Sequence, residues 1–188
     1  AYDAVLSAMQ KVESITGRRY KPFEYFGDPN AEDIIIMMGS GAETAEETIN
    51  YLNSLGEKVG LIKVRLYRPF NSSALVEALP RSVKNIAVLD RTKESGAVGE
   101  PLYTDVVTSL AKMNISANVI GGRYGLGSKE FTPACVKAVF DNLKSERKNN
   151  FTVGIVDDVT KLSLPLKDFH ISHDNIEYKF FGLGSDGT

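Results

Sequence analysis

The sequence is poor in cysteine: Cys135 is the one cysteine in 188 residues. A single thiol can form neither an internal disulfide nor a metal cluster held by several thiolates, so a reducing compartment is expected. No apolar run approaches the roughly 20 residues that a membrane-spanning helix needs. The N-terminus has neither a basic patch nor an apolar signal core. We therefore expect no membrane insertion and no export.

The sequence also lacks a marked excess of either charge. Its 22 basic and 24 acidic residues are spread along the chain, which leaves no electrostatic footprint for nucleic acid. Hydrophobic residues make up 43% of the chain, enough to bury a core. At this length the chain is expected to hold one full domain and a modest remainder, and it is too short for a complete multi-domain enzyme.

Both ends of the sequence interrupt a structural pattern. The chain opens inside a helical repeat formed by Val5, Ala8, Met9 and Val12, which Gly17 closes. It stops inside a glycine turn at residues 187–188. We interpret the sequence as a piece of a longer polypeptide.

Between the ends, buried strands alternate with amphipathic helices. The strands are expected at residues 33–38, 59–66, 85–90, 117–120 and 151–156. Helix starts are indicated by Asn71-Ser72-Ser73, by Gly99-Glu100-Pro101 and by Thr132-Pro133, where a capping residue or a first-turn proline precedes an apolar face. This alternation predicts an α/β fold: a three-layer α/β/α sandwich around a mostly parallel, five-stranded sheet.

The alternation stops after about residue 160. Residues 161–176 contain Pro165 and both histidines without a sustained period, and are interpreted as a linker. Residues 177–181 are expected to form the first strand of another domain.

Ligands and partners of a parallel sheet usually meet the loops at the carboxyl ends of its strands. The first such loop, Gly39-Ser40-Gly41, could present backbone amides to a phosphate, although a tight strand-to-helix turn needs glycine for steric reasons alone, which is the interpretation favoured. The later loops, at residues 67–70, 90–94 and 121–129, share charged residues. These are either a solvated edge or a docking surface for a neighbouring domain: Arg68, Arg91, Lys93, Glu94, Arg123 and Lys129.

Other candidate sites are weaker. Residues 182–187 match G-x-G-x-x-G directly after a strand-like segment, a pattern that can bind a pyrophosphate. His170 and His173 lack a third metal ligand, Asp157-Asp158 is most simply a polar turn, and Cys135 has no evident base partner. No catalytic residue and no metal site are predicted in the chain.

Seven segments carry a resemblance that covers nearly the whole chain. They are Gly39-Ser40-Gly41 with Glu43 and Thr44, KVRLYRPF (63–70), IAVLDRTKE (86–94), GEPLY (99–103), GGRYGLGSK (121–129), FTPACVKAVFDNL (131–143) and FTVGIVDDVT (151–160). Together they resemble the pyruvate:ferredoxin (flavodoxin) oxidoreductase family.

The resemblance implies a large homodimeric enzyme that uses thiamine diphosphate and [4Fe–4S] clusters. It turns pyruvate and coenzyme A into acetyl-CoA and carbon dioxide, with electrons passed to ferredoxin or flavodoxin, in the cytoplasm or in an organelle of an anaerobic eukaryote. The family's thiamine- and pyruvate-binding residues and its cluster cysteines belong to other domains, so none is assigned here. A glycine-rich turn of the family contacts coenzyme A, and the resemblance carries that role to Gly184, Ser185, Asp186, Gly187 and Thr188.

The same resemblance divides the chain into four parts. Residues 1–29 are a helix and lead-in from the preceding domain, 30–160 a domain like the C-terminal domain of transketolase, 161–176 a linker, and 177–188 the start of the next domain. The main domain is then a scaffold whose charged loops dock against its neighbours, and the fragment is inactive alone. Two alternatives stay open: the same region of a pyruvate:NADP oxidoreductase, and a free-standing nucleotide-binding module that uses Gly39-Ser40-Gly41.

Overall fold

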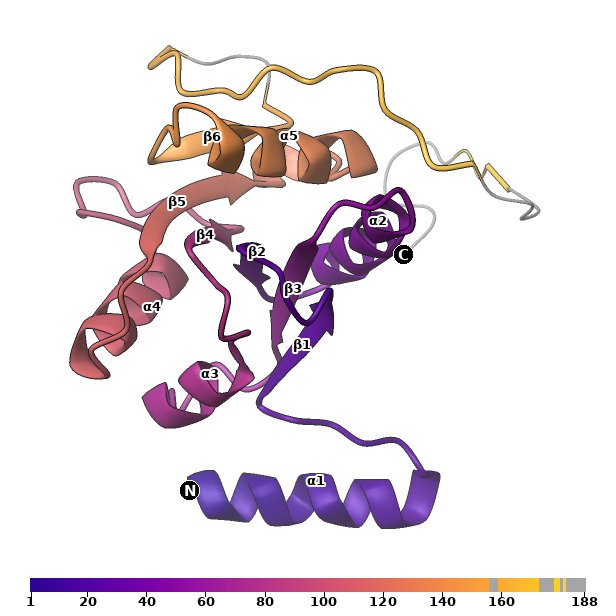
Figure 1. Ribbon diagram of the computed structural model, residues 1–188, viewed down its shortest axis with the longest axis vertical. Helices are drawn as coiled ribbons and strands as arrows, with labels where there is room; N and C mark the ends of the chain where they lie inside the picture. The colour runs from indigo at the N-terminus through magenta and orange to yellow at the C-terminus, as the bar shows by residue number, and fades with distance from the viewer. Residues whose placement is uncertain (156–158, 173–177, 180, 182–188) are drawn as a thin grey trace.

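The computed structural model describes residues 1–155, 159–172, 178–179 and 181 (Figure 1). Within them the helices are α1 (Tyr2–Thr16), α2 (Gly41–Ser54), α3 (Ser72–Ala78), α4 (Pro101–Lys112) and α5 (Pro133–Lys144), with a short 3-10 turn η1 (Leu126–Ser128). The strands are β1 (Phe23–Gly27), β2 (Asp33–Met37), β3 (Val59–Val64), β4 (Asn85–Asp90), β5 (Asn118–Tyr124) and β6 (Phe151–Val153).

The strands form one mostly parallel sheet in the order β1-β3-β2-β4-β5-β6. Only β1 is antiparallel to its neighbour, with Tyr25 opposite Ile62. The predicted three-layer α/β sandwich is confirmed, with six strands in the described chain instead of five. The sequence pattern missed β1 because this edge strand is half-buried and mixes aromatic residues with a glutamate, unlike the continuous apolar runs of the central strands.

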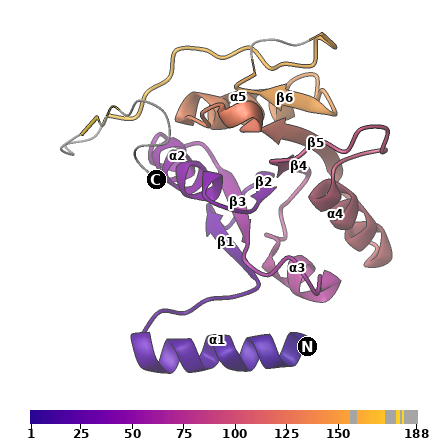
Figure 2. The same cartoon turned by 180° about the vertical axis from the view of Figure 1, so that it is seen from behind.

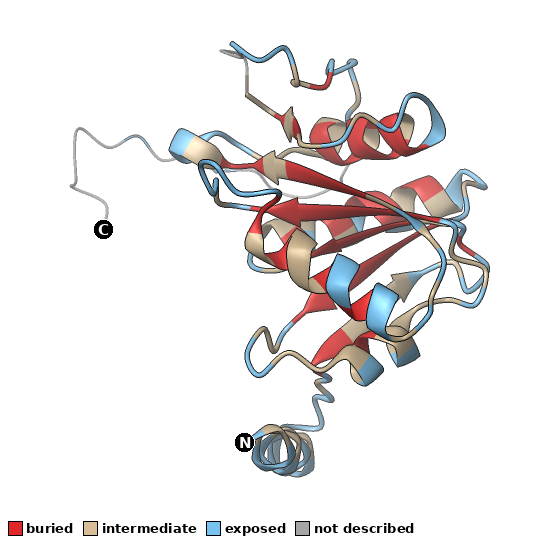
Figure 3. Cartoon of the chain, turned by 90° about the vertical axis from the view of Figure 1, so that its left-hand side faces the viewer, coloured by how far each residue is buried: buried red, intermediate tan, exposed pale blue. Residues whose placement is uncertain are grey.

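Two helices cover each face of the sheet (Figures 2 and 3). Side chains of α2 and α5 share one buried cluster with Ile35, Leu61 and Leu89. Side chains of α3 and α4 share the other with Ile34 and Val88. Because successive residues of a strand point to opposite faces, a strand covered on both sides must be apolar throughout, as β2 is from Ile34 to Met37.

Strand β5 is longer than the sequence predicted. Gly121 and Gly122 were assigned to a loop, but they continue the strand to Tyr124. A Cβ at Gly122 would lie 2.1 Å from the Phe151 ring, and one at Gly121 would lie 3.0 Å from the Tyr103 ring. The two glycines therefore make room for aromatic rings on the sheet, and the loop that follows is shorter than expected.

The helix ends follow the predicted signals. The Asn71 side chain accepts a hydrogen bond from the Ala74 amide at 2.9 Å, and Pro101 and Pro133 open their helices. Gly17 closes α1 in the left-handed conformation and donates its amide to the Glu13 carbonyl. In α3, α4 and α5, tertiary packing and local capping thus agree.

Residues 159–172 form a strap across the outside of α5 (Figure 1). Ser163 makes a parallel bridge with Thr152 of β6, and the backbone of Thr152 exchanges hydrogen bonds with Leu162 and Leu164. Leu164 is buried in the α2/α5 cluster, and the Phe169 ring contacts the Tyr51 ring edge-on. The first part of the segment expected to be a linker is therefore packed on the domain.

Candidate functional site at the carboxyl edge of the sheet

The chain changes direction across the sheet between β2 and β4. From β2 it passes to β3 on one side, and from β3 it crosses to β4 on the other. Such a switch point leaves a crevice at the carboxyl ends of the two strands, which is where open α/β sheets bind ligands. Here the crevice lies beside the turn from β2 into α2.

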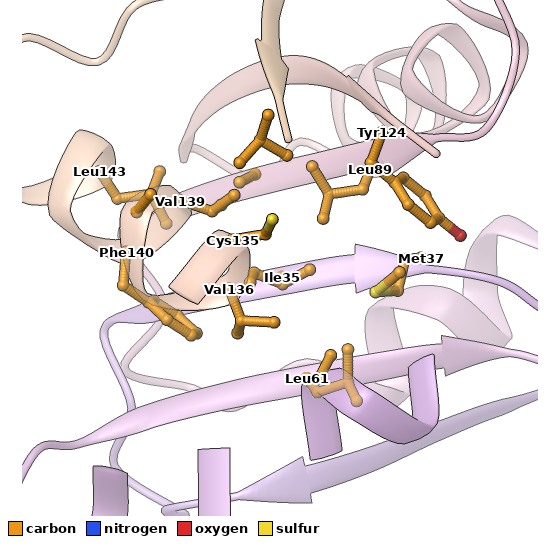
Figure 4. Packing of buried hydrophobic residues seen from close by; sticks show 14 of the residues in the cluster. Ile35, Met37, Leu61, Leu89, Tyr124, Cys135, Val136, Val139, Phe140 and Leu143 are labelled. Atoms are coloured by element: carbon orange, nitrogen blue, oxygen red, sulfur yellow. The ribbon is translucent and has the colours of Figure 1, made fainter. Parts of the chain in front are cut away.

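That turn depends on both of its glycines. Gly39 has a φ of 82°, which favours glycine, and a Cβ at Gly41 would lie 2.8 Å from the Tyr124 ring. Tyr124 points toward Met37 (Figure 4) and donates its hydroxyl to the Met38 carbonyl at 3.1 Å. The packing of Tyr124 thus explains Gly41 without a ligand, in line with the steric interpretation of this turn.

A hollow of about 310 Å³ opens beside the turn. Its lining includes five polar or charged side chains: Ser40, Thr44, Arg91, Lys129 and Glu130. The Arg91 guanidinium Nε donates to the Gly125 carbonyl at 3.3 Å, so this cation is partly engaged by the next loop. Burial raises the pKa of Tyr124, and the charge of Arg91 opposes the shift. Charges of both signs therefore line the hollow, and its residues form no pairing of a nucleophile with a base.

Arg68 is an exposed arginine of the predicted docking set. Its guanidinium stacks 3.9 Å from the centroid of the Tyr67 ring and lies 2.7 Å from the Asp105 carboxylate. The hydrogen bond that Arg68 donates to Asp105 raises the pKa of Arg68, and burial together with Asp105 raises the pKa of Tyr67. Because more than half of the Arg68 side chain is exposed, this stacked and paired arginine lies at the surface, at the end of β3.

Arg123 is placed differently. Its side chain is 13% exposed and its Nη1 lies 3.6 Å from Glu100, whose side chain is 7% exposed. Its Nη2 donates to the Asn150 carbonyl at 2.7 Å. In β5 it lies opposite Asp90, so it stands inside the sheet and not on a loop.

Asp90 explains how α4 starts. Its two carboxylate oxygens accept the backbone amides of Leu102 and Tyr103 at 3.0 and 3.1 Å. Burial raises the pKa of Asp90, although these two hydrogen bonds lower it. Asp90 therefore works as a cap reaching from a strand to the N-terminus of a helix, a role that the sequence pattern did not reveal.

Lys93 and Glu94 lie on the exposed loop between β4 and α4. The Glu94 amide donates to Glu100 Oε1 at 3.4 Å, and the side chain of Val98 on the same loop is 89% exposed. The structure thus keeps Arg68, Lys93 and Glu94 at the surface and directs Arg123 inward.

One buried cation had no counterpart in the sequence analysis. Lys63 is 3% exposed; its Nζ pairs with Glu43 at 2.7 Å and with Glu46, and lies 5.0 Å from the Phe26 ring centroid. A lysine inside a strand of otherwise apolar residues was the available signal. The cluster joins α2 to β3 and keeps the charge of Lys63 compensated.

Two of the weaker candidates make polar contacts with near neighbours in the chain. His170 is exposed beside Asp168, and buried Cys135 contacts the Thr132 hydroxyl at 3.5 Å. Residues 156–158, 173–177 and 182–188 lie outside the described part, and with them Asp157-Asp158, His173 and the predicted coenzyme A turn Gly184–Thr188. Of the last expected strand, Tyr178, Lys179 and Phe181 are described and none is in a strand.

Two kinds of feature are absent from the described residues. Among them no group of three histidine, cysteine, aspartate or glutamate side chains could hold a metal ion. In the same residues no helix combines the length and apolar character needed to cross a membrane.

Comparison with known proteins supplies what the geometry alone does not. Residues 31–136 match the family described as pyruvate:ferredoxin oxidoreductase core domain II. The chain is 60% identical over 186 residues to a pyruvate-flavodoxin oxidoreductase of Trichormus variabilis, covering 96% of this chain and 16% of that protein. It is 58% identical over 188 residues to a pyruvate:ferredoxin oxidoreductase of Moorella thermoacetica, covering 98% of this chain and again 16% of the relative.

Solved structures are more distant. A 2-oxoglutarate:ferredoxin oxidoreductase of Magnetococcus marinus is 20% identical, with a TM-score of 0.47 over 73% of this chain and 21% of the other. A split-gene transketolase is 17% identical, with a TM-score of 0.42 over 56% of this chain and 34% of the other. By contrast with these partial structural matches, nearly all of this chain aligns with the two sequence relatives above, and it spans about a sixth of their length.

Proposed function

Because this chain belongs to the pyruvate:ferredoxin oxidoreductase family, we propose that it is one domain of a longer enzyme that oxidises pyruvate. That enzyme would convert pyruvate and coenzyme A into acetyl-CoA and carbon dioxide and pass the electrons to ferredoxin or flavodoxin. The observation that carries the proposal is the identity of 60% and 58% to two such oxidoreductases over nearly all of this chain.

The residues of this chain do not fit the cofactors that the family implies. A [4Fe–4S] cluster needs four thiolates, and Cys135 is both alone in the sequence and buried. The described residues also contain no group of three or more histidine, cysteine, aspartate or glutamate side chains that could hold a metal ion. Both groups are therefore proposed to bind in other domains, and no catalytic step is assigned to this chain.

The proposed role of this chain is to scaffold and dock those domains. Residues 30–160 would be the scaffold, flanked by residues 1–29 from the preceding domain and joined by residues 161–176 to the next domain, which starts at 177–188. The exposed loop residues Arg68, Lys93 and Glu94 support docking, because they lie together with the other strand-end loops on one edge of the sheet. The complete enzyme is proposed to be a cytoplasmic homodimer that meets ferredoxin or flavodoxin in solution.

The experiment that tests the main proposal uses the complete polypeptide. Supplied with pyruvate, coenzyme A and oxidised ferredoxin or flavodoxin, it should reduce the carrier, and omission of either substrate should stop the reaction. The 188-residue chain, given the same substrates and cofactors, should fold and show no turnover. Pyruvate oxidation by the short chain, or none by the complete polypeptide with its cofactors loaded, would contradict the proposal.

A finer proposal concerns coenzyme A. In this proposal the backbone amides of Gly184–Thr188 bind the phosphates of coenzyme A, since glycine has no Cβ to block their approach. In the complete enzyme, Gly187→Val should raise the KM for coenzyme A several-fold and leave the KM for pyruvate nearly unchanged. Normal coenzyme A dependence in a correctly folded variant would leave this turn with a structural role.

Two alternatives remain testable. A pyruvate:NADP oxidoreductase would carry flavin-reductase motifs elsewhere in its polypeptide and reduce NADP. A free-standing nucleotide-binding module would titrate with an adenine nucleotide to one saturable site at the hollow beside Ser40. The contact between Gly41 and Tyr124 supports a structural turn over that module.

A further inference from the structure

Helix α1 is almost separate from the rest of the domain. It has 15 residues and none of them is buried. It lies beyond β1 and α3, apart from both layers of helices (Figures 1 and 3). Tyr2 and Leu6 line one side of a hollow of about 460 Å³ whose other side is formed by β1 and α3.

The helix has more apolar surface than this contact uses. Partly covered residues, among them Val5 and Met9, share a face with Tyr2 and Leu6. Beside that face runs a second, exposed apolar stripe: Ala4, Ala8, Val12 and Ile15. Their spacings of four, four and three residues place them in one row along the helix, here called the α1 stripe. The side chains of Val12 and Ile15 are 41% and 74% exposed.

The remaining face is polar. Ser7, Gln10, Lys11 and Ser14 are all exposed, so they mark the side of α1 that solvent can cover. The α1 stripe lies between this polar face and the face turned to the domain. An amphipathic helix of a globular protein normally packs its whole apolar arc, and here half of that arc is bare.

Helix energetics argue that the bare stripe has a partner. Isolated helices of about 12–15 residues are marginal in water even when rich in alanine, and most of their stability in proteins comes from packing. Gly17 caps the C-terminal end of α1, but the last turn has no basic residue and no residue of the helix is buried. Burial in the domain therefore does not account for this helix.

We propose that the α1 stripe packs against an apolar surface in another part of the longer polypeptide, outside these 188 residues. This inference rests on the proposed function, because it takes the chain to be one domain of a longer oxidoreductase. The length outside the chain supports this occupant, since the curated relatives are about six times as long and match this chain over 16% of their sequence. Alanines at two positions of the stripe allow a second helix to approach closely.

Hydrogen exchange on the two forms of the protein is the direct test. In the 188-residue chain, the amides of residues 6–16 should exchange within about tenfold of an unfolded peptide, because little packing opposes local opening. In the complete polypeptide the same amides should be protected at least about a hundredfold more. Equal exchange in the two forms would overturn the proposal.

Matched variants locate the contact on the helix. Val12→Lys with Ile15→Lys places two charges on the α1 stripe, and Gln10→Lys with Ser14→Lys places two on the polar face. In the complete polypeptide the first pair should remove at least about tenfold of the protection and the second pair should keep it. Similar loss in both pairs, or in neither, would show that the stripe is not the contact.

Two further readouts separate the outcomes. Sedimentation of the 188-residue chain should give a monomer; a dimer abolished by the stripe pair would make a second copy the occupant and overturn the proposal. Pyruvate-dependent carrier reduction by the wild-type polypeptide is measured in parallel. If the α1 amides are protected but the polypeptide does not oxidise pyruvate, this inference holds and the proposed function is wrong. If the polypeptide oxidises pyruvate but the α1 amides are not protected, the proposed function holds and this inference is wrong.

Discussion

At the scale of single residues, the two arginines Arg68 and Arg123 have opposite roles despite similar positions in the sequence pattern. Arg123 compensates a glutamate that is almost fully buried, and Arg68 pairs at the surface. Breaking a buried pair leaves an uncompensated charge, which costs about 3–5 kcal/mol, and an exposed pair contributes about 0–1 kcal/mol.

We therefore expect Arg123→Ala to destabilise the chain by about 2–4 kcal/mol. This is less than the full cost of an uncompensated buried charge, because Glu100 still accepts a hydrogen bond from the Glu94 amide. Arg68→Ala should change the free energy of unfolding by less than about 1 kcal/mol. Urea unfolding of the two variants measures both. Equal losses would mean that Arg123 is solvated like Arg68.

Gly41 offers a second test at this scale. An alanine there must displace the Tyr124 ring, and overpacking of this kind costs about 1–3 kcal/mol. In a Tyr124→Leu background the same change should cost clearly less, because the ring is gone. A double-mutant cycle by thermal or urea unfolding gives the coupling. No coupling would leave Gly41 without a packing role and favour the ligand interpretation of the turn.

Tyr25 sets a pH dependence. Burial, with the nearby charge of Asp28, raises its pKa from 10.0 to about 12, and its hydroxyl donates to the Asp28 carbonyl. Between these two pH values the unfolded tyrosine ionises and the folded one does not, so folding retains a proton and stability falls as pH rises. The contribution is fully present below pH 10 and is lost as pH passes about 12.

We expect the loss of stability between pH 9 and about pH 12 to be smaller in Tyr25→Phe than in the wild type. Unfolding at each pH measures it, and absorbance titration of the phenolates should show one late-titrating tyrosine missing from the variant. An identical pH slope in both proteins would contradict the assignment.

At the scale of elements, the sequence predicted the central strands and the edge strand β6, but it missed the other edge strand, β1, and ended β5 too early. Strands β2, β3 and β4 are continuous apolar runs because helices cover them on both faces, and that burial is visible in the sequence. The glycines of β5 were misassigned because their function is to admit Phe151 and Tyr103, which are distant in sequence. Steric demands between distant segments leave no local pattern.

The strap provides the element-scale prediction. Leu164 is 7% exposed and belongs to the α2/α5 core cluster, whereas Leu166, two residues later, is 47% exposed. Leu164→Ala should lower the free energy of unfolding by about 2–3 kcal/mol, and Leu166→Ala should change it by less than about 0.5 kcal/mol. Urea unfolding compares them. If both variants are as stable as the wild type, the strap contributes nothing to the domain and acts as the free linker that the sequence suggested.

At the scale of the whole molecule, the sequence predicted only that the candidate site lies at the carboxyl edge of the sheet. Strand order is set by tertiary packing, so the sequence could place the loops at the carboxyl ends but could not tell which charges face solvent. The inward turn of Arg123 follows from β5 extending past Gly122, and the capping of α4 by Asp90 follows from β4 lying beside that helix. Both are consequences of the assembled sheet.

The remaining prediction concerns docking at that edge. Arg68 paired with Asp105 and Lys84 paired with Glu32 are both exposed ion pairs, but Lys84 directly precedes β4 and so lies at the opposite, amino edge of the sheet. In the 188-residue chain, Arg68→Ala and Lys84→Ala should each change the free energy of unfolding by less than about 1 kcal/mol. In the complete polypeptide, Arg68→Ala should reduce assembly or pyruvate oxidation several-fold, because an exposed arginine stacked on tyrosine is well suited to bury at an interface. Lys84→Ala should leave both unchanged. Size-exclusion chromatography measures assembly of the two variants, and carrier reduction measures their activity. Equal effects of the two variants would mean that Arg68 is a solvated surface residue without a docking role.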